Sequence, residues 1–356
     1  MPRLKKKLRS SKIGLPPGAL VHLGEIKTPA PLLSLIDFSP DSFAEHELLD
    51  LAALDALPRG PGVRWLNIHG VHDGALLSAI GERFGLHPLV IEDILNTDQR
   101  PKVDDFDDYL FIVVHIYDAD RERLDVTTDQ ISLVIGRDFV LTFQERPTGT
   151  FAPIRQRLRA EKSPMRRVGS DYLAYSMLDS IVDSYFTVIE RFSESAEDLE
   201  EEILNNPQTK TLQQIHELKR HVMRLRRTLW PLRETLTTLY HGQSDFFRPE
   251  TLLYLRDVYD HTVHVLESLE DQRDLLTGLL DIYLTTVSNR VNVEVRLLTV
   301  VATLFMPATL ISGIFGMNFH TMPWLDQPNG FWQTLALMAG VAISMTLVFW
   351  NRRLLR

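Results

Sequence analysis

Two long uninterrupted apolar segments lie near the C-terminal end of the chain. Neither the 21 residues from Leu297 to Met317 nor the 20 residues from Phe331 to Trp350 include an ionisable side chain. At about 1.5 Å per residue, a helix of either length can cross the roughly 30 Å of hydrocarbon in a bilayer. Helices in the core of a soluble protein are usually shorter and keep a polar face. The pattern therefore predicts two membrane-spanning helices, the second covering residues 331–351, joined by a short loop at 318–330.

Basic residues flank this pair of segments on one side of the membrane. The loop at 318–330 contains no Lys or Arg, and five Arg residues lie just before the first segment or just after the second, at Arg290, Arg296, Arg352, Arg353 and Arg356. Short flanking segments rich in Lys and Arg stay on the cytoplasmic side. We therefore expect a multi-pass protein of the cell (inner) membrane, with an external loop, both termini in the cytoplasm and a basic tail at 352–356.

Residues 1–165 mix the periodicities of strands and helices. Helical spacing of apolar residues occurs at Gly74–Phe84 and at Pro88–Leu95. Runs rich in β-branched and aromatic residues predict four strands, at Gly62–Ile68, Tyr109–Val114, Gln130–Ile135 and Phe139–Phe143. The short gap at Gly136-Arg137-Asp138 predicts that the last two strands form a hairpin. The sequence thus predicts a cytoplasmic α/β domain with a partly antiparallel sheet.

Downstream of Pro164 the strand patterns end and long helical patterns begin. Apolar residues spaced by three, four or seven from Leu173 to Ile203 predict an amphipathic helix, and a similar stripe from Leu218 to Leu239 predicts a second. The first becomes acidic toward its end and the second is basic, so we expect an antiparallel helical hairpin over 166–246. No turn cluster follows from Pro249 until the first apolar segment. The sequence predicts one stalk helix over 247–317 that continues into the first span.

Composition limits the chemistry that the chain can perform. It has no cysteine, so thiolate metal sites and disulfides are excluded, and any metal must be bound by oxygen or imidazole. The net charge of −9 and the lack of a continuous basic stripe argue against a nucleic-acid partner. No Gly-rich phosphate-binding loop is present, so no nucleotide cofactor is expected. No nucleophile or acid–base pair stands out, so an enzyme is not expected.

From residue 281 to residue 313, almost every position on one face of the stalk helix is small or polar, in contrast to bulky neighbours such as Leu304 and Phe305. Its positions are spaced alternately by three and four residues: Asp281, Thr285, Ser288, Asn292, Val295, Thr299, Ala302, Met306, Thr309 and Gly313. Such a seam, turned toward copies of itself, predicts a parallel helical bundle whose centre is a channel. The alternative is close packing of small residues without a pore. Two spans per chain cannot enclose a conduit, so a channel requires an oligomer.

The tripeptide Gly316-Met317-Asn318 lies at the end of the first span and is a family motif. Five further segments of the chain also match motifs of one family: His87-Pro88-Leu89, Glu92-Asp93-Ile94, Gln99-Arg100-Pro101-Lys102, Trp230-Pro231-Leu232-Arg233-Glu234 and Arg256-Asp257-Val258-Tyr259-Asp260-His261. With the two C-terminal spans and the long preceding helix, nearly the whole chain resembles the CorA family of divalent-cation transporters. The resemblance implies an α+β membrane protein that forms a homopentameric funnel in the lipid bilayer, with the first spans lining the pore.

The resemblance also assigns roles along the pore. Gly316, Met317 and Asn318 would form the selectivity element at the external mouth, where amide and carbonyl oxygens hold Mg²⁺ through the water that it releases reluctantly. Other residues of the first span and the helix before it would line the pore. Asn292 and Thr309 would form rings of oxygen atoms, and Leu298 and Met306 would form an apolar constriction. The other pore-lining residues would be Val295, Thr299, Ala302 and Gly313.

A further implication is gating by the transported ion. Asp93 matches the family's regulatory carboxylate, and Asp257 matches its partner on the neighbouring subunit, with Mg²⁺ bound between them. From Glu250 to Asp281 the stalk has eight acidic residues and two Arg, so subunits would repel there without a cation. The predicted function is channel-like transport of Mg²⁺, with Co²⁺ or Ni²⁺ as further substrates, down the electrochemical gradient. The alternatives are a zinc, cobalt or nickel transporter on the same scaffold, and a membrane-tethered sensor.

Some residues depart from the family's usual pattern. Phe315 occupies a position where Tyr often precedes the tripeptide, and Trp324 one where many members carry Glu, so the external loop has Asp326 as its one carboxylate. Elsewhere, His261 and His264 are three residues apart and could share a metal, with solvated helix positions as the alternative interpretation.

Overall fold

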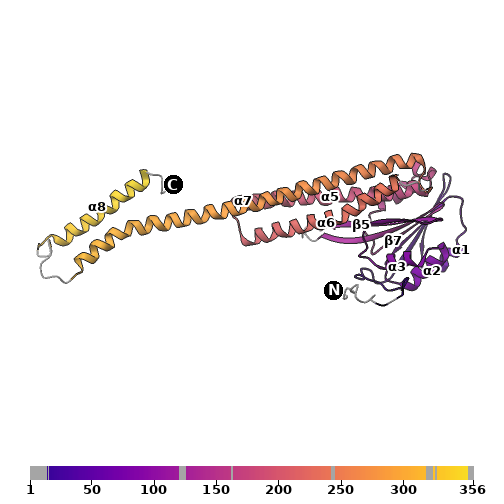
Figure 1. Cartoon of the computed structure of the whole chain (residues 1–356), viewed down its shortest axis with the longest axis horizontal. Coiled ribbons are helices and arrows are strands. Elements are labelled where there is room, and N and C mark those ends of the chain that lie inside the picture. The colour runs from indigo at the N-terminus through magenta and orange to yellow at the C-terminus, as the bar shows by residue number, and fades with distance from the viewer. Residues whose placement is uncertain are drawn as a thin grey trace. The chain divides into compact units, whose positions relative to one another are not determined.

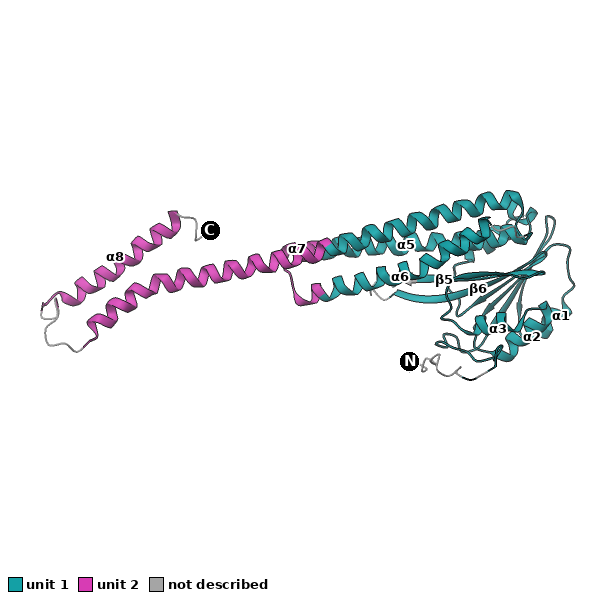
Figure 2. Cartoon of the chain, in the orientation of Figure 1, with its two compact units in different colours: residues 1–199, 213–277 teal, residues 200–212, 278–356 magenta. Residues whose placement is uncertain are grey.

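The computed structural model describes residues 14, 16–119, 126–161, 163–241, 245–317, 324 and 327–351. The chain divides into two compact units (Figure 2). The first unit comprises residues 1–199 and 213–277, and the second comprises residues 200–212 and 278–356.

A mixed sheet of seven strands forms the centre of the first unit, in the order β2-β1-β3-β7-β6-β5-β4. The pairing of β3 with β7 is parallel and the other pairings are antiparallel. The strands are β1 (Leu32–Phe38), β2 (Phe43–Leu48), β3 (Val63–His69), β4 (Lys102–Asp105), β5 (Tyr109–Ala119), β6 (Val126–Gly136) and β7 (Phe139–Gln144).

The sequence patterns predicted β3, β5, β6 and β7, and the predicted hairpin of β6 and β7 is confirmed, with Ile135 opposite Val140. The patterns did not reveal β1, β2 and β4. β2 and β4 are largely polar strands without a fully buried face, and a short apolar run such as β1 does not distinguish a strand from a helix.

Three short helices cover one face of the sheet: α1 (Leu51–Ala56), α2 (Gly74–Phe84) and α3 (Pro88–Leu95) (Figure 1). Their apolar residues, such as Leu77 and Ile94, join Leu66, Phe111 and Phe143 of the sheet in one buried core. α3 begins with Pro88 directly after His87, whose Nδ1 accepts a hydrogen bond of 3.2 Å from the backbone N–H of Leu89. The same helix carries Glu92 and Asp93 near its end.

Long helices lie on the other side of the sheet. α5 (Ser170–Asn205) and α6 (Thr209–His241) bond to it, and the first part of α7 (Pro249–Phe315) packs on these two helices. α4 (Ala152–Arg159) and a 3₁₀ turn at Pro164–Arg167 precede them. The Tyr185 hydroxyl of α5 donates to the carbonyl of His115 on β5, and the Tyr117 hydroxyl on β5 donates to Thr228 of α6 at 2.5 Å. Within the first unit, Arg226 of α6 pairs with Glu270 of α7 at 2.5 Å.

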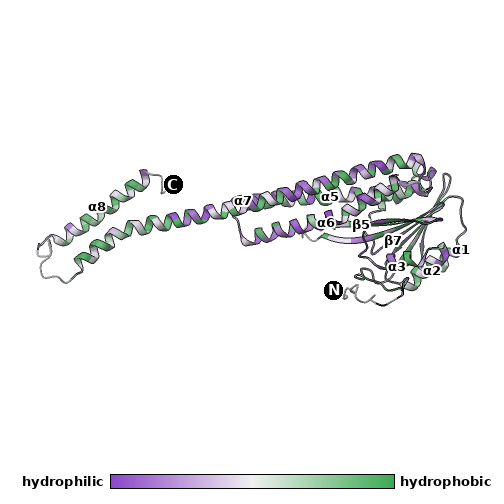
Figure 3. Ribbon diagram, in the orientation of Figure 1, coloured by the Kyte–Doolittle hydropathy of each residue, from purple (hydrophilic) through white to green (hydrophobic). Residues whose placement is uncertain are grey.

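The second unit contains the two apolar segments, the first of which is the C-terminal part of α7. α7 is one helix of 67 residues that passes through Pro307 without a break, as the sequence predicted, and α8 (Gly330–Asn351) follows. Both contain a window apolar enough to cross a membrane, with mean hydropathies of 2.0 and 1.6. Figure 3 shows that apolar residues dominate α8 and the C-terminal part of α7. Only 6% and 0% of these windows are buried, so neither is the core helix of a soluble fold within this chain. The predicted α/β domain, long helices and two C-terminal apolar helices are confirmed.

Candidate functional site

The predicted pore-lining residues lie on α7 in the second unit. All of them are exposed in the single chain: Asn292, Val295, Leu298, Thr299, Ala302, Met306, Thr309 and Gly313. Among them, Leu298 and Met306 are 69% and 68% exposed. Such a contiguous apolar surface on a helix requires a cover of protein or lipid.

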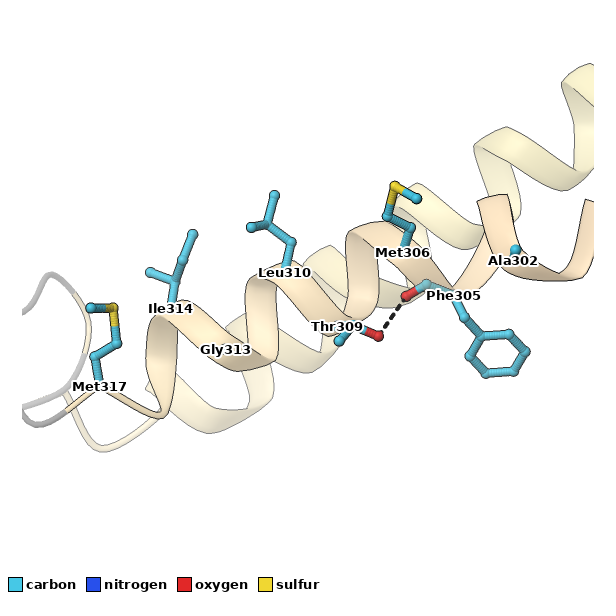
Figure 4. A pocket seen from close by; sticks show the side chains of 8 residues that line it. All are labelled: Ala302, Phe305, Met306, Thr309, Leu310, Gly313, Ile314 and Met317. Carbon is cyan, nitrogen blue, oxygen red and sulfur yellow. Dashed lines mark hydrogen bonds between the residues drawn. The ribbon is translucent and has the colours of Figure 1, made fainter. Parts of the chain in front are cut away.

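A shallow groove of about 690 Å³ follows this face of α7. Figure 4 shows that Met306, Leu310, Ile314 and Met317 project to one side of the helix, whereas Phe305 projects away from it. The groove is lined by Ala302, Phe305, Met306, Thr309, Leu310, Gly313, Ile314 and Met317. None of these side chains carries a charge, so the groove offers no carboxylate that could bind a divalent cation directly. A surface of this kind suits a cation that keeps its water, or a constriction that excludes ions when it dries.

The threonines of the seam bond within their own helix. The hydroxyl of Thr299 donates to the carbonyl of Val295 at 2.8 Å, and that of Thr309 donates to the carbonyl of Phe305 at 3.0 Å (Figure 4). This bonding to the preceding turn is common for threonine in helices. The hydroxyl protons therefore already have partners, and the two threonines do not by themselves require water on this face.

The first two residues of the tripeptide directly follow α7 and bond to carbonyls of its last turn. The N–H of Gly316 donates to the carbonyl of Ser312 at 2.9 Å, and the N–H of Met317 donates to that of Ile314 at 3.2 Å. A Cβ atom at Gly316 would lie 3.2 Å from the carbonyl oxygen of Ser312, which is tighter than ordinary packing. Asn318 lies outside the described residues, as do His320 and Asp326.

Asp93 is already paired within the first unit. Its Oδ2 accepts a hydrogen bond of 2.8 Å from the Nζ of Lys102, and its Oδ1 accepts one from the side-chain amide of Gln99. Lys102 also bonds to Asp104, and the Asp93 side chain is 20% exposed. Burial alone would lower the pKa of Lys102, but the hydrogen bonds to Asp104 and Asp93 outweigh burial and raise that pKa above its ordinary value.

The backbone around Asp93 is held in place. Its carbonyl accepts hydrogen bonds from the N–H of Asn96 at 3.2 Å and from the side chain of Gln130 at 3.3 Å. The side-chain oxygen of the buried Gln130 also accepts a hydrogen bond of 3.2 Å from the backbone N–H of Gln99, and the backbone N–H of Gln130 donates to the side chain of Glu145 at 2.7 Å. β6 thus fixes the turn that brings Lys102 to Asp93.

Asp257 lies near the start of α7 and its side chain is 62% exposed. The Oδ2 of Asp257 is 3.9 Å from the Nε2 of His261. Among the described residues, no hydrogen bond or ion pair joins Asp257 to Asp93. The two predicted regulatory carboxylates are therefore not joined by such a bond within a single chain.

A cluster next to Asp257 was not predicted. Ligand atoms of Asp179 and Asp183 on α5 and of His261 on α7 lie within 4.8 Å of one another, which suits a metal ion. Burial and the nearby Asp183 raise the pKa of Asp179, against the opposing effect of His261. Sequence spacing alone groups His261 with His264, three residues further along. The spacing of four residues between Asp179 and Asp183 is a local signal, but their proximity to His261 depends on the packing of α5 against α7.

Comparisons with known proteins agree with these features. The family model described as "CorA-like Mg2+ transporter protein" matches residues 60–353. The chain is 40% identical over 350 residues to a protein of Thermotoga maritima named cobalt/magnesium transport protein CorA, and the match covers 98% of this chain and 99% of that protein.

Two solved structures share the fold. The complete structure of the CorA magnesium transporter from Methanocaldococcus jannaschii has a TM-score of 0.73 at 21% identity, and the match covers 90% of this chain and 98% of that chain. The structure of the full-length CmaX protein has a TM-score of 0.69 at 21% identity, and the match covers 92% of this chain and 98% of that chain.

Proposed function

Because the chain belongs to the family of CorA-like Mg²⁺ transporters, we propose that it conducts hydrated Mg²⁺ across a membrane through a pore lined by α7, and that Co²⁺ can use the same route. This is transport rather than enzymatic catalysis. The observation that carries the proposal is the exposed seam of α7, whose residues are mostly small or polar and are uncharged within the span, on a helix that is unbroken up to Phe315.

The seam supports an oligomeric pore. One α7 and one α8 cannot enclose a water-filled path, so several copies must place their α7 seams around a common axis. The family resemblance specifies a homopentamer in the lipid bilayer. In such an assembly the exposed surfaces of Leu298 and Met306 would be covered by other copies, and the two rings would form the apolar constriction that stops ions when it dries.

Selection would occur at the external end of α7. Mg²⁺ holds its water tightly, so a ring of Gly316, Met317 and Asn318 would recognise the hydrated ion through carbonyl and amide oxygens. Asn292 and Thr309 would provide further oxygens along the path. The absence of any charged residue between Leu297 and Met317 is consistent with an ion that passes with its water and is not held at a strong site.

Regulation would use Mg²⁺ bound between Asp93 of one subunit and Asp257 of the next. Two observations fit a cation there: Asp257 is an exposed carboxylate, and the ammonium of Lys102 already lies between the carboxylates of Asp93 and Asp104. A bound Mg²⁺ supplies the positive charge that turns repulsion between acidic surfaces into attraction. High internal Mg²⁺ would join the subunits and close the pore, and low internal Mg²⁺ would release them.

The orientation follows from the distribution of Arg. The protein would reside in the cell (inner) membrane with both termini in the cytoplasm, the sheet unit in the cytoplasm and the segment between α7 and α8 outside. Because the sequence contains no Gly-rich phosphate-binding loop, the driving force would be the electrochemical gradient of the ion.

The test is Mg²⁺ uptake by liposomes that contain the purified full-length protein and a Mg²⁺-sensitive dye. We expect uptake that cobalt(III) hexaammine, a mimic of hydrated Mg²⁺, inhibits and that Asn318→Ala abolishes. Asn329→Ala is the matched control, because Asn329 is the same residue type in the same connection but outside the tripeptide. A protein that carries no divalent flux would be a tethered sensor, and one that carries Zn²⁺ or Ni²⁺ but not Mg²⁺ would have a different substrate.

A further inference from the structure

Lys102 places a positive charge at the carboxylate to which the proposed function assigns a regulatory cation. Its Nζ lies 2.8 Å from the Oδ2 of Asp93, bonds to the Oδ2 of Asp104, and lies 5.5 Å from the centroid of the Phe111 ring. Two carboxylates and an aromatic face are the partners that define a cation position in a protein. The ammonium therefore occupies the position of a small cation at Asp93.

We propose that Lys102 is a built-in competitor of the divalent cation at Asp93, and that it sets the Mg²⁺ concentration at which this site fills. Lys102 neutralises Asp93 while the cation is absent, and it must leave the carboxylate before the cation can bind. The inference rests on the proposed regulatory role of Asp93 and names a residue that tunes it.

The structure determines which partner has to move. The backbone carbonyl of Asp93 is held by Asn96 and by the buried Gln130, so the carboxylate stays at the end of α3. Lys102 lies on β4, a strand of four residues at the edge of the sheet, and its side chain is 33% exposed. Because its stem is flexible and reaches solvent, Lys102 can withdraw without any change in the backbone.

Asp104 keeps the competitor close after it is displaced. Asp104 is two residues beyond Lys102 on β4, so the two side chains project from the same face of the strand. An ammonium that has left Asp93 can remain bonded to Asp104, ready to return. This gives Lys102 a high effective concentration at Asp93, as expected for a tethered ligand.

The effect on affinity follows from the fraction of molecules in which Asp93 is free. If Lys102 covers the carboxylate in about nine of ten molecules, the apparent dissociation constant for Mg²⁺ is raised about tenfold. Repulsion between the retained ammonium and a bound divalent cation adds to the effect. The site then responds to abundant Mg²⁺ and not to traces.

The experiment measures Mg²⁺ binding to the full-length protein in detergent at constant ionic strength. Calorimetry gives the binding directly, and thermal unfolding gives the midpoint, which is the Mg²⁺ concentration that produces half of the maximal stabilisation. Lys102→Met keeps much of the apolar stem and removes the charge, and we expect it to lower this midpoint about tenfold. Lys102→Gln also lacks the charge and should lower the Mg²⁺ midpoint as well, and it replaces Lys102→Met if that variant folds poorly. Lys102→Arg keeps the charge and should stay within about twofold of the parent. Arg59→Met is the control, because it removes one positive charge from the same unit, at the exposed pair with Asp138, and should change nothing.

The outcomes separate this inference from the proposed function. Asp93→Asn should weaken Mg²⁺ binding and abolish the effect of Lys102→Met in the double variant. If Asp93→Asn leaves binding unchanged, the regulatory role of Asp93 is wrong and the inference fails with it. If Asp93→Asn weakens binding but both uncharged variants at 102 leave the midpoint where it was, only the competitor role of Lys102 is overturned.

Discussion

The aromatic rings of Phe315 and Trp324 stack with their centroids 6.3 Å apart and their planes 12° apart. Phe315 is the last residue of α7, and Trp324 lies in the connection to α8. These are the two positions at which the chain departs from the Tyr and Glu that are usual in the family it resembles. The two residues at these positions contact each other, because the ring of Trp324 packs on the residue before the tripeptide.

Loss of this stack should lower the thermal stability of the protein. Trp324 has a φ of 73°, a left-handed conformation that costs about 1–2 kcal/mol for a residue with a Cβ. Trp324→Ala loses the aromatic pair, worth about 1 kcal/mol, and keeps the backbone cost. Trp324→Gly loses the pair but removes the backbone cost, so its melting temperature in detergent should lie above that of the Ala variant.

The matched control for the stack is Trp350→Ala, which removes an exposed indole from the end of α8. Its melting temperature should lie close to that of the parent. Equal melting temperatures for the Ala and Gly variants at position 324 would contradict the role assigned to the left-handed backbone.

The carboxylate of Asp171 should make stability depend on acidic pH. It accepts hydrogen bonds from Arg248 at 2.9 and 3.0 Å and from the Thr251 hydroxyl at 2.6 Å, and so ties the start of α5 to the start of α7. Burial alone would raise the pKa of Asp171, but these hydrogen bonds outweigh it and hold the pKa below its ordinary value of 3.8. Since the folded-state pKa is lowered, this stabilisation is complete above the ordinary pKa and is lost as the pH falls through the folded-state pKa.

Asp171→Ala is expected to lower the free energy of unfolding by about 2 kcal/mol at neutral pH, the scale of hydrogen bonds to a charged group. The measurement is denaturant unfolding of parent and variant between neutral pH and about pH 3, and the difference between them should shrink at the acidic end. Asp138→Ala, at an exposed carboxylate, serves as the control. A difference that stays constant over the whole range would show that Asp171 acts without its charge.

Asp257→Ala should weaken inhibition by internal Mg²⁺. The Asp257 carboxylate is exposed and lies beside His261, Asp179 and Asp183, so its removal reduces the charge that attracts a cation to this surface. In liposomes with controlled internal Mg²⁺, we expect the inhibitory concentration to rise about tenfold, equivalent to about 1.4 kcal/mol of binding free energy. The uptake rate at low internal Mg²⁺ should remain near that of the parent.

Asp260→Ala is the matched control for Asp257, because Asp260 is an exposed carboxylate about one turn further along the same helix. It should leave the inhibitory concentration unchanged. Equal inhibition in the parent and in Asp257→Ala would remove Asp257 from the regulatory mechanism.

The sequence predicted part of the candidate site and missed another part for a physical reason. The seam of α7 was visible because residues spaced by three and four share a helix face, and Asp93, Asp257 and Asn318 were named through the family resemblance. Their roles stay predictions. The intrahelical bonds of Thr299 and Thr309 also follow from local geometry, and they weaken the argument that seam polarity alone demands water.

The sequence by itself determined the two apolar helices, the unbroken course of α7 and four of the strands, because each depends on the length and periodicity of a local run of residues. Only the tertiary structure decided that β1, β2 and β4 extend the sheet, that Lys102 pairs with Asp93, and that Asp179 and Asp183 face His261. The three strands join the sheet through backbone pairing, the Lys102–Asp93 pair depends on the turn that Gln130 holds, and the cluster at His261 depends on the packing of α5 against α7. Such contacts join residues from different elements, and no periodicity within one element records them.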